Sequence, residues 1–192
     1  MSESKKRRGT LIVLSAPSGG GKSTIAKALF AAFPNLRFSI SATTRAVRPG
    51  EVNGREYYFL KIEEFERRIK AGELVEYEQI YGDYYGTLKS EIEKAFQNNE
   101  PILFDVDVKG ALSIKGAYPN EAILIFLQPP SFEVLKSRLV NRNTENAEAL
   151  KRRLERVKME LELGRRFDYQ VINDDLNHAI AEVKSVVEKY LL

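Results

Sequence analysis

Short apolar runs alternate along the chain with segments whose apolar residues recur at helical spacing. The apolar runs at residues 10–15, 102–108, 122–127 and 167–173 predict buried strands. Helical spacing predicts a helix over residues 22–33, ended by Pro34, and a last helix that begins near Leu176. Between them, Ser131 is expected to cap the start of a helix, and Gly164 to end a long one. Strands that alternate with helices predict an α/β fold with a central parallel sheet flanked by helices.

Residues 37–88 interrupt this rhythm. They are rich in Ser, Thr, Tyr, Arg and Gly, and only residues 62–71 carry a helical pattern. We interpret them as a lobe inserted into the α/β core, since they hold too many polar groups for an ordinary crossover connection.

The composition excludes several classes of protein. The 192 residues, 43% of them hydrophobic, suffice for one sizeable core. No apolar run approaches the roughly 18 residues of a membrane span, and the basic start lacks the apolar core of a secretory signal. The chain has no cysteine and one histidine, His178, which excludes disulfides, zinc-thiolate sites and thiol catalysis. We therefore expect a cytoplasmic protein with no membrane partner, either a monomer or a homo-oligomer.

The net charge of +3 lies at one end of the chain. Residues 1–9 hold four basic residues and one acidic residue, which leaves 26 basic and 26 acidic residues in the rest. Binding to a nucleic-acid backbone needs a basic surface on the folded body. We predict a disordered basic tail over residues 1–9 and no nucleic-acid partner.

A glycine-rich segment joins the first expected strand to the first expected helix. This is the context of a phosphate-binding loop, in which glycines let backbone N–H groups converge on phosphate oxygens. Lys22 would reach the β- and γ-phosphates, and the Ser23 hydroxyl would ligate Mg²⁺. Ala16 replaces the leading glycine of the pattern, which is acceptable if its φ is negative. A glycine-rich turn without a ligand is the alternative. The segment comprises Ala16, Pro17, Ser18, Gly19, Gly20, Gly21, Lys22, Ser23 and Thr24.

Arginines and acids follow in a second group. Arg45 and Arg48, with the Ser41 hydroxyl upstream and Tyr57 downstream, suit a phosphate monoester, although an exposed polar loop would look the same. Asp105 and Asp107 end an apolar strand and are expected to share one face of it, and one of them, taken to be Asp105, could hold Mg²⁺ through water. A solvated strand end is the alternative.

A third group is basic. Arginines on a closing segment can neutralise the charge of a phosphoryl group in transfer, whereas a solvated helix face is the alternative. The group comprises Arg138, Arg142, Arg152, Arg153 and Arg156.

Together these segments closely resemble the guanylate kinase family over residues 10–191. The resemblance rests on S-A-P-S-G-G-G-K-S-T, T-T-R-x-x-R-x-G-E-x-x-G-x-x-Y, Y-Y-G-T, D-V-D and V-I-N-D-D. It implies a P-loop NTPase fold with a core (10–36, 89–135 and 160–192), a GMP-binding lobe (37–88) and a mobile lid (136–159). It also implies ATP-dependent phosphorylation of GMP and dGMP, with Mg²⁺, in purine nucleotide metabolism. Lys109 stands where the family usually has glutamine.

The family's functional residues carry over by position. The resemblance implies a GMP site in which four side chains, Arg45, Arg48, Tyr57 and Tyr85, grip the phosphate. It implies that the lid arginines hold the ATP phosphates and that Asn173 lies near adenine. Catalytic roles fall to Lys22, Arg45, Arg138, Arg142 and Arg153, and the GMP site comprises Ser41, Arg45, Arg48, Tyr57, Glu76, Tyr85, Thr87 and Asp107.

Hydrogen-bonding chemistry agrees with guanine as the base. Its N1–H and exocyclic amine are adjacent donors that Glu76 can accept together, with Asp107 taking the second amine proton. Ser41 or Thr87 can donate to O6. Adenine would instead turn a lone pair toward the carboxylate. Two alternatives stay open: a non-catalytic phosphoprotein-binding module of this family, and a kinase for another nucleoside monophosphate.

Overall fold

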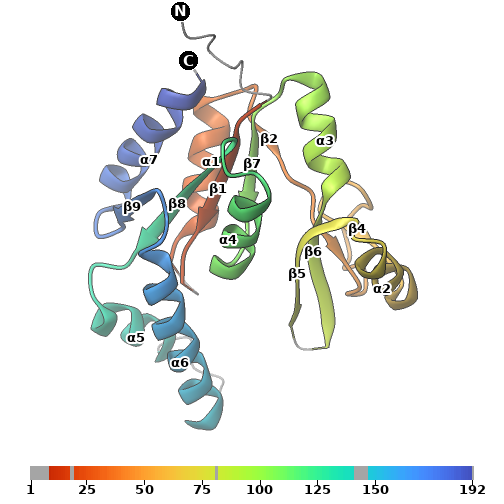
Figure 1. Ribbon diagram of the computed structural model, residues 1–192. Coiled ribbons are helices and arrows are strands. Elements are labelled where there is room, and N and C mark those ends of the chain that lie inside the picture. Colours follow the sequence, from red (N-terminus) through yellow and green to blue (C-terminus); the bar gives the residue numbers. More distant parts are fainter. Residues whose placement is uncertain (1–8, 18–19, 81, 141–146, 192) are drawn as a thin grey trace, which may run out of the picture.

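A five-stranded parallel sheet forms the centre of the molecule (Figure 1). The computed structural model describes residues 9–17, 20–80, 82–140 and 147–191, so the expected tail lies outside them apart from Gly9. All four predicted strands are present, and two-residue β2 adds an edge. The order across the sheet is β2 (Arg37–Phe38), β7 (Ile102–Asp105), β1 (Leu11–Ser15), β8 (Ala122–Gln128) and β9 (Tyr169–Ile172).

Helices cover both faces of this sheet, which confirms the α/β fold. Side chains alternate along β1, so that Ile12 and Leu14 pack with α1 (Lys22–Ala32) and α7 (Leu176–Leu191) on one face. Leu11 and Val13 pack on the other face, with α3 (Lys89–Asn98), α4 (Val108–Ala117) and the end of α6 (Ala147–Gly164). The continuous apolar run of β1 is the pattern of a strand buried on both sides.

A second sheet forms within residues 37–88. Its order is β4 (Tyr58–Phe59), β3 (Ala42–Thr43), β6 (Asp83–Leu88) and β5 (Leu74–Ile80). The predicted helix is α2 (Ile62–Lys70), whose fully buried Phe65 packs with Ala42 and Leu88 and stacks on the Tyr84 ring. This small separate core agrees with the expected insertion, although the sequence did not predict its strands.

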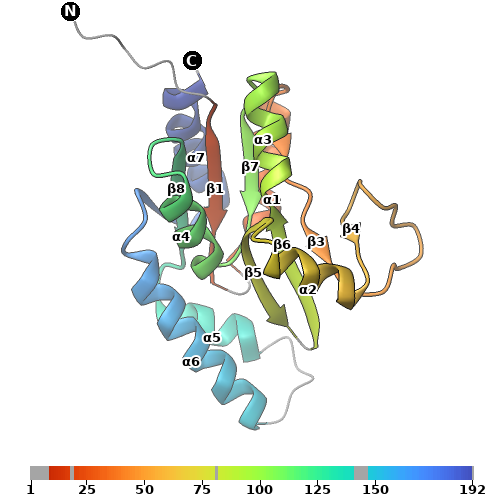
Figure 2. The ribbon, with the colours of Figure 1, turned by 45° about the vertical axis from the view of Figure 1, so that its right-hand side comes forward.

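Helices α5 (Phe132–Val140) and α6 pack on each other through Leu135 and Val157. The Ser131 hydroxyl accepts a hydrogen bond from the backbone N–H of Val134, which confirms the predicted cap. Gly164 ends α6 as predicted, where a Cβ would collide with the Phe126 ring. In both ribbon views this helix pair and the β5–β6 hairpin extend from the same end of the central sheet (Figures 1 and 2).

The strand predicted over residues 102–108 is shorter than expected. It ends at Asp105, and Asp107 becomes the N-cap of α4, where its carboxyl accepts a hydrogen bond of 2.7 Å from the N–H of Gly110. The prediction that Asp105 and Asp107 share one strand face was therefore wrong, because a capping carboxyl leaves the strand to satisfy a free helical N–H. Helices α3 and α4 were not predicted either.

No helix within the described residues is both long and apolar enough to cross a membrane.

Candidate nucleotide-binding site

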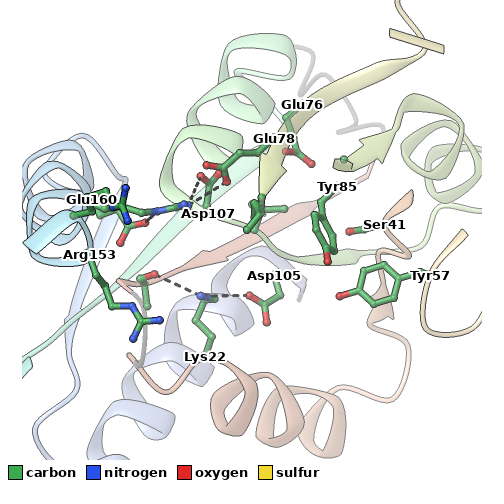
Figure 3. A pocket seen from close by; sticks show the side chains of 16 residues that line it. Lys22, Ser41, Tyr57, Glu76, Glu78, Tyr85, Asp105, Asp107, Arg153 and Glu160 are labelled. Atoms are coloured by element: carbon green, nitrogen blue, oxygen red, sulfur yellow. Dashed lines mark hydrogen bonds and ion pairs between the residues drawn. The ribbon is translucent and has the colours of Figure 1, made fainter. Parts of the chain in front are cut away.

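A cavity of about 960 Å³ opens at the carboxyl end of the central sheet. The phosphate-loop segment, the second sheet and α6 all contribute to its wall (Figure 3). Lys22 and Glu76 both line it, so the expected triphosphate and guanine positions share one cavity. The predicted site residues in its wall are Ala16, Lys22, Ser41, Tyr57, Glu76, Tyr85, Asp105, Asp107 and Arg153.

Lys22 lies at the first residue of α1, between the loop and the central sheet. Its Nζ donates to the carbonyl oxygen of Ala16 at 3.5 Å and lies 3.8 Å from Asp105 Oδ1. Burial raises the pKa of the Asp105 carboxyl, and the neighbouring Lys22 ammonium opposes that rise. The strand end and the loop are thus joined by a charge pair that faces the cavity (Figure 3).

Two glycines of the loop have steric reasons to be glycine. A Cβ at Gly20 would lie 2.6 Å from the Cβ of Ala16, and Gly21 has a φ of +87°. A Cβ at Gly21 would also lie 2.6 Å from Asn173 Nδ2. Ala16 does not belong to the positive-φ residues of the described chain, so alanine is compatible with its position in the loop.

Asn173 ties the far edge of the sheet to the loop. Buried after β9, it donates from Nδ2 to the carbonyl oxygen of Gly20 at 2.8 Å. Its side-chain amide therefore supports the loop backbone, and its place near adenine stays a prediction of the resemblance.

The remaining residues expected to bind ATP surround this loop. The Pro17 carbonyl accepts the N–H of Gly20, and Ser23 and Thr24 are exposed in the first turn of α1. Ser18, Gly19 and Arg142 lie outside the described residues. Arg138 belongs to α5, but its side chain is likewise outside them.

Hard oxygen donors are available for a magnesium ion. The Ser23 hydroxyl and the Asp105 carboxylate are donor types that Mg²⁺ accepts, in sites where phosphates and water complete the octahedron. No group of three or more His, Cys, Asp or Glu side chains in the described part of the chain could hold a metal by itself. The residues present therefore fit a cation delivered with a nucleotide.

The opposite end of the cavity is acidic. Glu76 on β5 faces Thr87 on β6, and the buried Thr87 hydroxyl donates to Glu76 Oε1 at 2.6 Å. Burial, reinforced by the charges of Asp107 and Glu78, raises the pKa of Glu76 to about 7, against the opposing hydrogen bond from Thr87. A Cβ at Gly110 would lie 2.9 Å from Glu76 Oε2 and 3.0 Å from Asp107 Oδ1. The missing Cβ of Gly110 therefore leaves room for both carboxyl groups beside the start of α4.

Tyr57 and Tyr85 of the inserted segment also line the cavity, and Arg45 lies beside Tyr57. The rings of Tyr57 and Tyr85 meet edge to face at 6.1 Å, and the Arg45 guanidinium lies 5.4 Å from the centre of the Tyr57 ring. Both nitrogens of the Arg45 fork donate to Glu51, which raises the pKa of Arg45 further. Arg48 is exposed and donates its backbone N–H to the same carboxylate.

Sequence reasoning missed two acidic residues, Glu78 and Glu160, which meet Arg156 of the predicted basic group on one wall. Arg156 of α6 bonds to Glu78 of β5 at 3.1 Å and to Glu160 one turn along α6 at 2.9 Å. Burial, then the charge of Asp107, raises the pKa of Glu78, and Arg156 opposes that rise. Glu78 could have been found because it lies two residues from Glu76 on the same face of a strand. Glu160 could have been found because it is four residues from an arginine on a helix.

Comparisons with known proteins agree on one family. A family model described as guanylate kinase matches residues 8–190. The guanylate kinase of Chlorobium luteolum is 47% identical over 191 residues, which are 100% of this chain and 97% of that protein. The guanylate kinase of Porphyromonas gingivalis is 49% identical, over 94% of this chain and 97% of that one. A crystal structure of guanylate kinase from Anaplasma phagocytophilum matches with a TM-score of 0.74 at 29% identity, over 97% of this chain and 88% of that one.

Proposed function

Since this chain belongs to the guanylate kinase family, we propose that it transfers the γ-phosphoryl group of ATP to GMP or dGMP, giving ADP and GDP or dGDP. The observation that carries the proposal is the single cavity that Lys22 and Glu76 both line. A cationic phosphate loop and an acidic base-binding wall in one cavity suit a reaction between two nucleotides. A cytoplasmic location and the oligomeric state stay predictions of the sequence.

The ATP phosphates would bind at the loop. Backbone N–H groups at the start of α1 and the Lys22 ammonium offer positive charge there. Arg153, which lines the same cavity, and Arg138 and Arg142, placed on this side by the resemblance, would add charge around the migrating group. Mg²⁺, held by Ser23 and Asp105, would neutralise phosphate charge.

Guanine would bind at the acidic wall. Glu76 would accept N1–H and one amine proton, and Asp107 the second amine proton, while Ser41 would donate to O6. Thr87 orients the Glu76 carboxyl through a hydrogen bond of 2.6 Å. The Glu76 carboxyl must be ionised to accept both protons, and its raised pKa makes this a pH-dependent requirement.

The phosphate of GMP would bind between these ends. Tyr57 and Tyr85 hydroxyls can donate hydrogen bonds, and the forked guanidiniums of Arg45 and Arg48 match phosphate oxygens. Because Glu51 occupies the Arg45 fork, a phosphate must share that guanidinium with a carboxylate or displace it. The acceptor oxygen is already anionic, so the chain needs no general base and contributes position, charge and exclusion of water.

The division into core (10–36, 89–135 and 160–192), GMP-binding lobe (37–88) and lid (136–159) is part of this proposal. The small core around Phe65 and the α5–α6 contact support two units that can move as bodies against the central sheet. Closure of both around the nucleotides would keep water from the phosphoryl group.

A coupled assay of ADP release with GMP, dGMP, AMP, CMP and UMP tests the proposal. We expect turnover with GMP and dGMP and at least about 10⁴-fold lower kcat/KM with AMP, because adenine would leave buried partners unpaired. Equal activity with AMP would remove the role of Glu76. Absence of ADP release with every acceptor would favour a binding module.

A further inference from the structure

Arg156 is the meeting point of three elements that lie far apart in the sequence. Its Nη2 lies 3.1 Å from Glu78 Oε2 on β5 and 3.4 Å from Asp107 Oδ2 at the start of α4. Its Nε donates to Glu160 Oε1 on its own helix at 2.9 Å. Figure 3 shows Glu78, Asp107 and Glu160 gathered on one wall of the cavity, across from Lys22.

The two oxygens of Asp107 have different tasks. Oδ1 accepts the backbone N–H of Gly110 at 2.7 Å and is committed to the helix cap. Oδ2 faces Arg156, and an ionised carboxyl oxygen has lone pairs for two donors. A donor on a ligand can therefore share Oδ2 with the guanidinium.

The Arg156 guanidinium lies between the Asp107 and Glu78 carboxyl groups and holds Asp107 Oδ2 in its orientation. Both carboxyl groups line the cavity, and Arg156 Nη2 contacts an oxygen of each. Like charges at close range in a partly dry cavity repel strongly. Removal of the guanidinium would turn Asp107 away from Glu78 or leave it in several orientations.

Glu160 holds the guanidinium itself in place. Only 5% of Glu160 is exposed, and its Oε1 receives the Arg156 Nε–H, which fixes the plane of the fork. With Nε so anchored, Nη2 reaches both Glu78 and Asp107 at once. A lysine has one nitrogen at its tip and no fork with which to keep this arrangement.

We propose that Arg156 is a positioning residue for guanine recognition, holding Asp107 Oδ2 toward the exocyclic 2-amino group of GMP. The inference rests on the proposed function and adds to it a residue of α6, outside the GMP-binding lobe. Selection of the amine then depends on a helix that also carries Arg153.

Binding of two nucleotides that differ only in this amine tests the inference. Inosine monophosphate is GMP without the 2-amino group. In Arg156→Gln we expect the dissociation constant of GMP to rise about tenfold, as when one charge-assisted contact is lost, and that of inosine monophosphate to change less than about twofold. Titration calorimetry on the full chain measures both constants.

Matched variants separate positioning from general damage. Arg165→Ala removes an arginine from the same stretch of chain, where it is 74% exposed and pairs only with Glu162 among the described side chains, and should leave both constants unchanged. Asp107→Asn should lower the preference for GMP as Arg156→Gln does, and the double variant should lose little more. Arg156→Lys keeps the charge without the fork and should lose an intermediate part of the preference, so it repeats the test if Arg156→Gln does not fold.

Equal weakening of both nucleotides by Arg156→Gln, or additive losses in the double variant, would overturn the positioning role. Failure of the proposed function has a separate signature, which is unmodified enzyme that releases no ADP with GMP. A wild-type chain that phosphorylates GMP but binds both nucleotides equally would overturn the role of Asp107 and this inference with it.

Discussion

The two ends of the cavity are built in different ways. The phosphate end, where we propose that ATP binds, is lined by Ala16 and Lys22 of one continuous segment, supported by Asp105 and Asn173. The guanine end, where we propose that the base binds, is assembled from β5, β6, the cap of α4 and one face of α6. The first can be recognised in the sequence because its geometry is local, whereas the second exists only after four elements have packed.

The ends also differ in electrostatics. The Lys22 ammonium and a helix N-terminus lie at the phosphate end, while at the other end Glu78, Asp107 and Glu160 contact the guanidinium of Arg156, and Glu76 lines the same cavity. The acidic wall is thus destabilised by its own charge in the absence of donors. This contrast predicts that changes at the phosphate end reduce turnover, and that changes at the guanine end alter selectivity, pH dependence and stability.

Lys22→Ala should have the largest effect. We expect kcat to fall by at least about 10²-fold, because a preorganised cation at the developing charge is lost. The dissociation constant of GMP should stay within about twofold, since the guanine wall is untouched. A coupled assay of ADP release measures kcat, and titration calorimetry measures the dissociation constant of GMP. Near-normal turnover would contradict the assignment, and Lys27→Ala, on the exposed side of α1, serves as the control.

Glu76→Gln should act at the other end. We expect kcat/KM for GMP to fall about 10²-fold because the amide turns a donor toward the guanine donors, with the KM of ATP nearly unchanged. Steady-state kinetics with each substrate varied test this. Glu66→Gln, an exposed carboxyl on α2, is the matched control. Unaltered GMP kinetics would remove Glu76 from the guanine site.

The same substitution should stabilise the fold at alkaline pH. The pKa of Glu76 is about 7 in the folded chain against 4.5 for an ordinary glutamate, so between these values the folded state binds more protons than the unfolded state. As pH rises from 4.5 to 7, the raised pKa of Glu76 lowers the free energy of unfolding. Above pH 7 this loss is complete and amounts to up to about 3 kcal/mol. Glu76→Gln should therefore raise the free energy of unfolding at pH 8 and not at pH 4. Urea unfolding of wild type and variant at pH 8 and pH 4 measures this difference, and an equal change at both pH values would contradict the prediction.

The pH dependence of GMP binding should follow the ionised fraction of Glu76. Near pH 6 the dissociation constant of GMP should be about tenfold above its value at pH 8, because most of the free enzyme then carries a protonated carboxyl. The phosphate of GMP also titrates near pH 6. The Glu76→Gln variant keeps the contribution of the GMP phosphate and lacks that of Glu76, so it serves as the reference. If the dissociation constant of GMP depends on pH in the same way in wild type and variant, the prediction is contradicted.

Gly21→Ala should have the smallest effect, confined to the loop. The φ of +87° and the close approach of Asn173 Nδ2 predict a loss of about 1–2 kcal/mol in stability and weaker ATP binding. Gly116→Ala in α4, where a Cβ meets nothing, should instead stabilise by about 0.5–1 kcal/mol. Thermal unfolding compares the melting temperatures of Gly21→Ala and Gly116→Ala, and equal melting temperatures would contradict the loop assignment.

The order of strands and helices in the core could be predicted because buried parallel strands such as β1 are apolar throughout. Strands β3 and β4 of the second sheet could not, since they have two residues each and are too short to show a period. Helix α4 was missed because the apolar run before it hid the cap at Asp107.

The sequence alone determined the α/β alternation and the glycine-rich connection between the first strand and the first helix of the core. These depend on the spacing of nearby residues, which backbone geometry converts directly into structure. Tertiary structure alone decided that Asn173 supports the loop, that Asp105 and Asp107 separate, and that Arg156 joins Glu78 to Asp107. Such contacts join elements tens of residues apart, and side-chain packing and charge, not local spacing, bring them together.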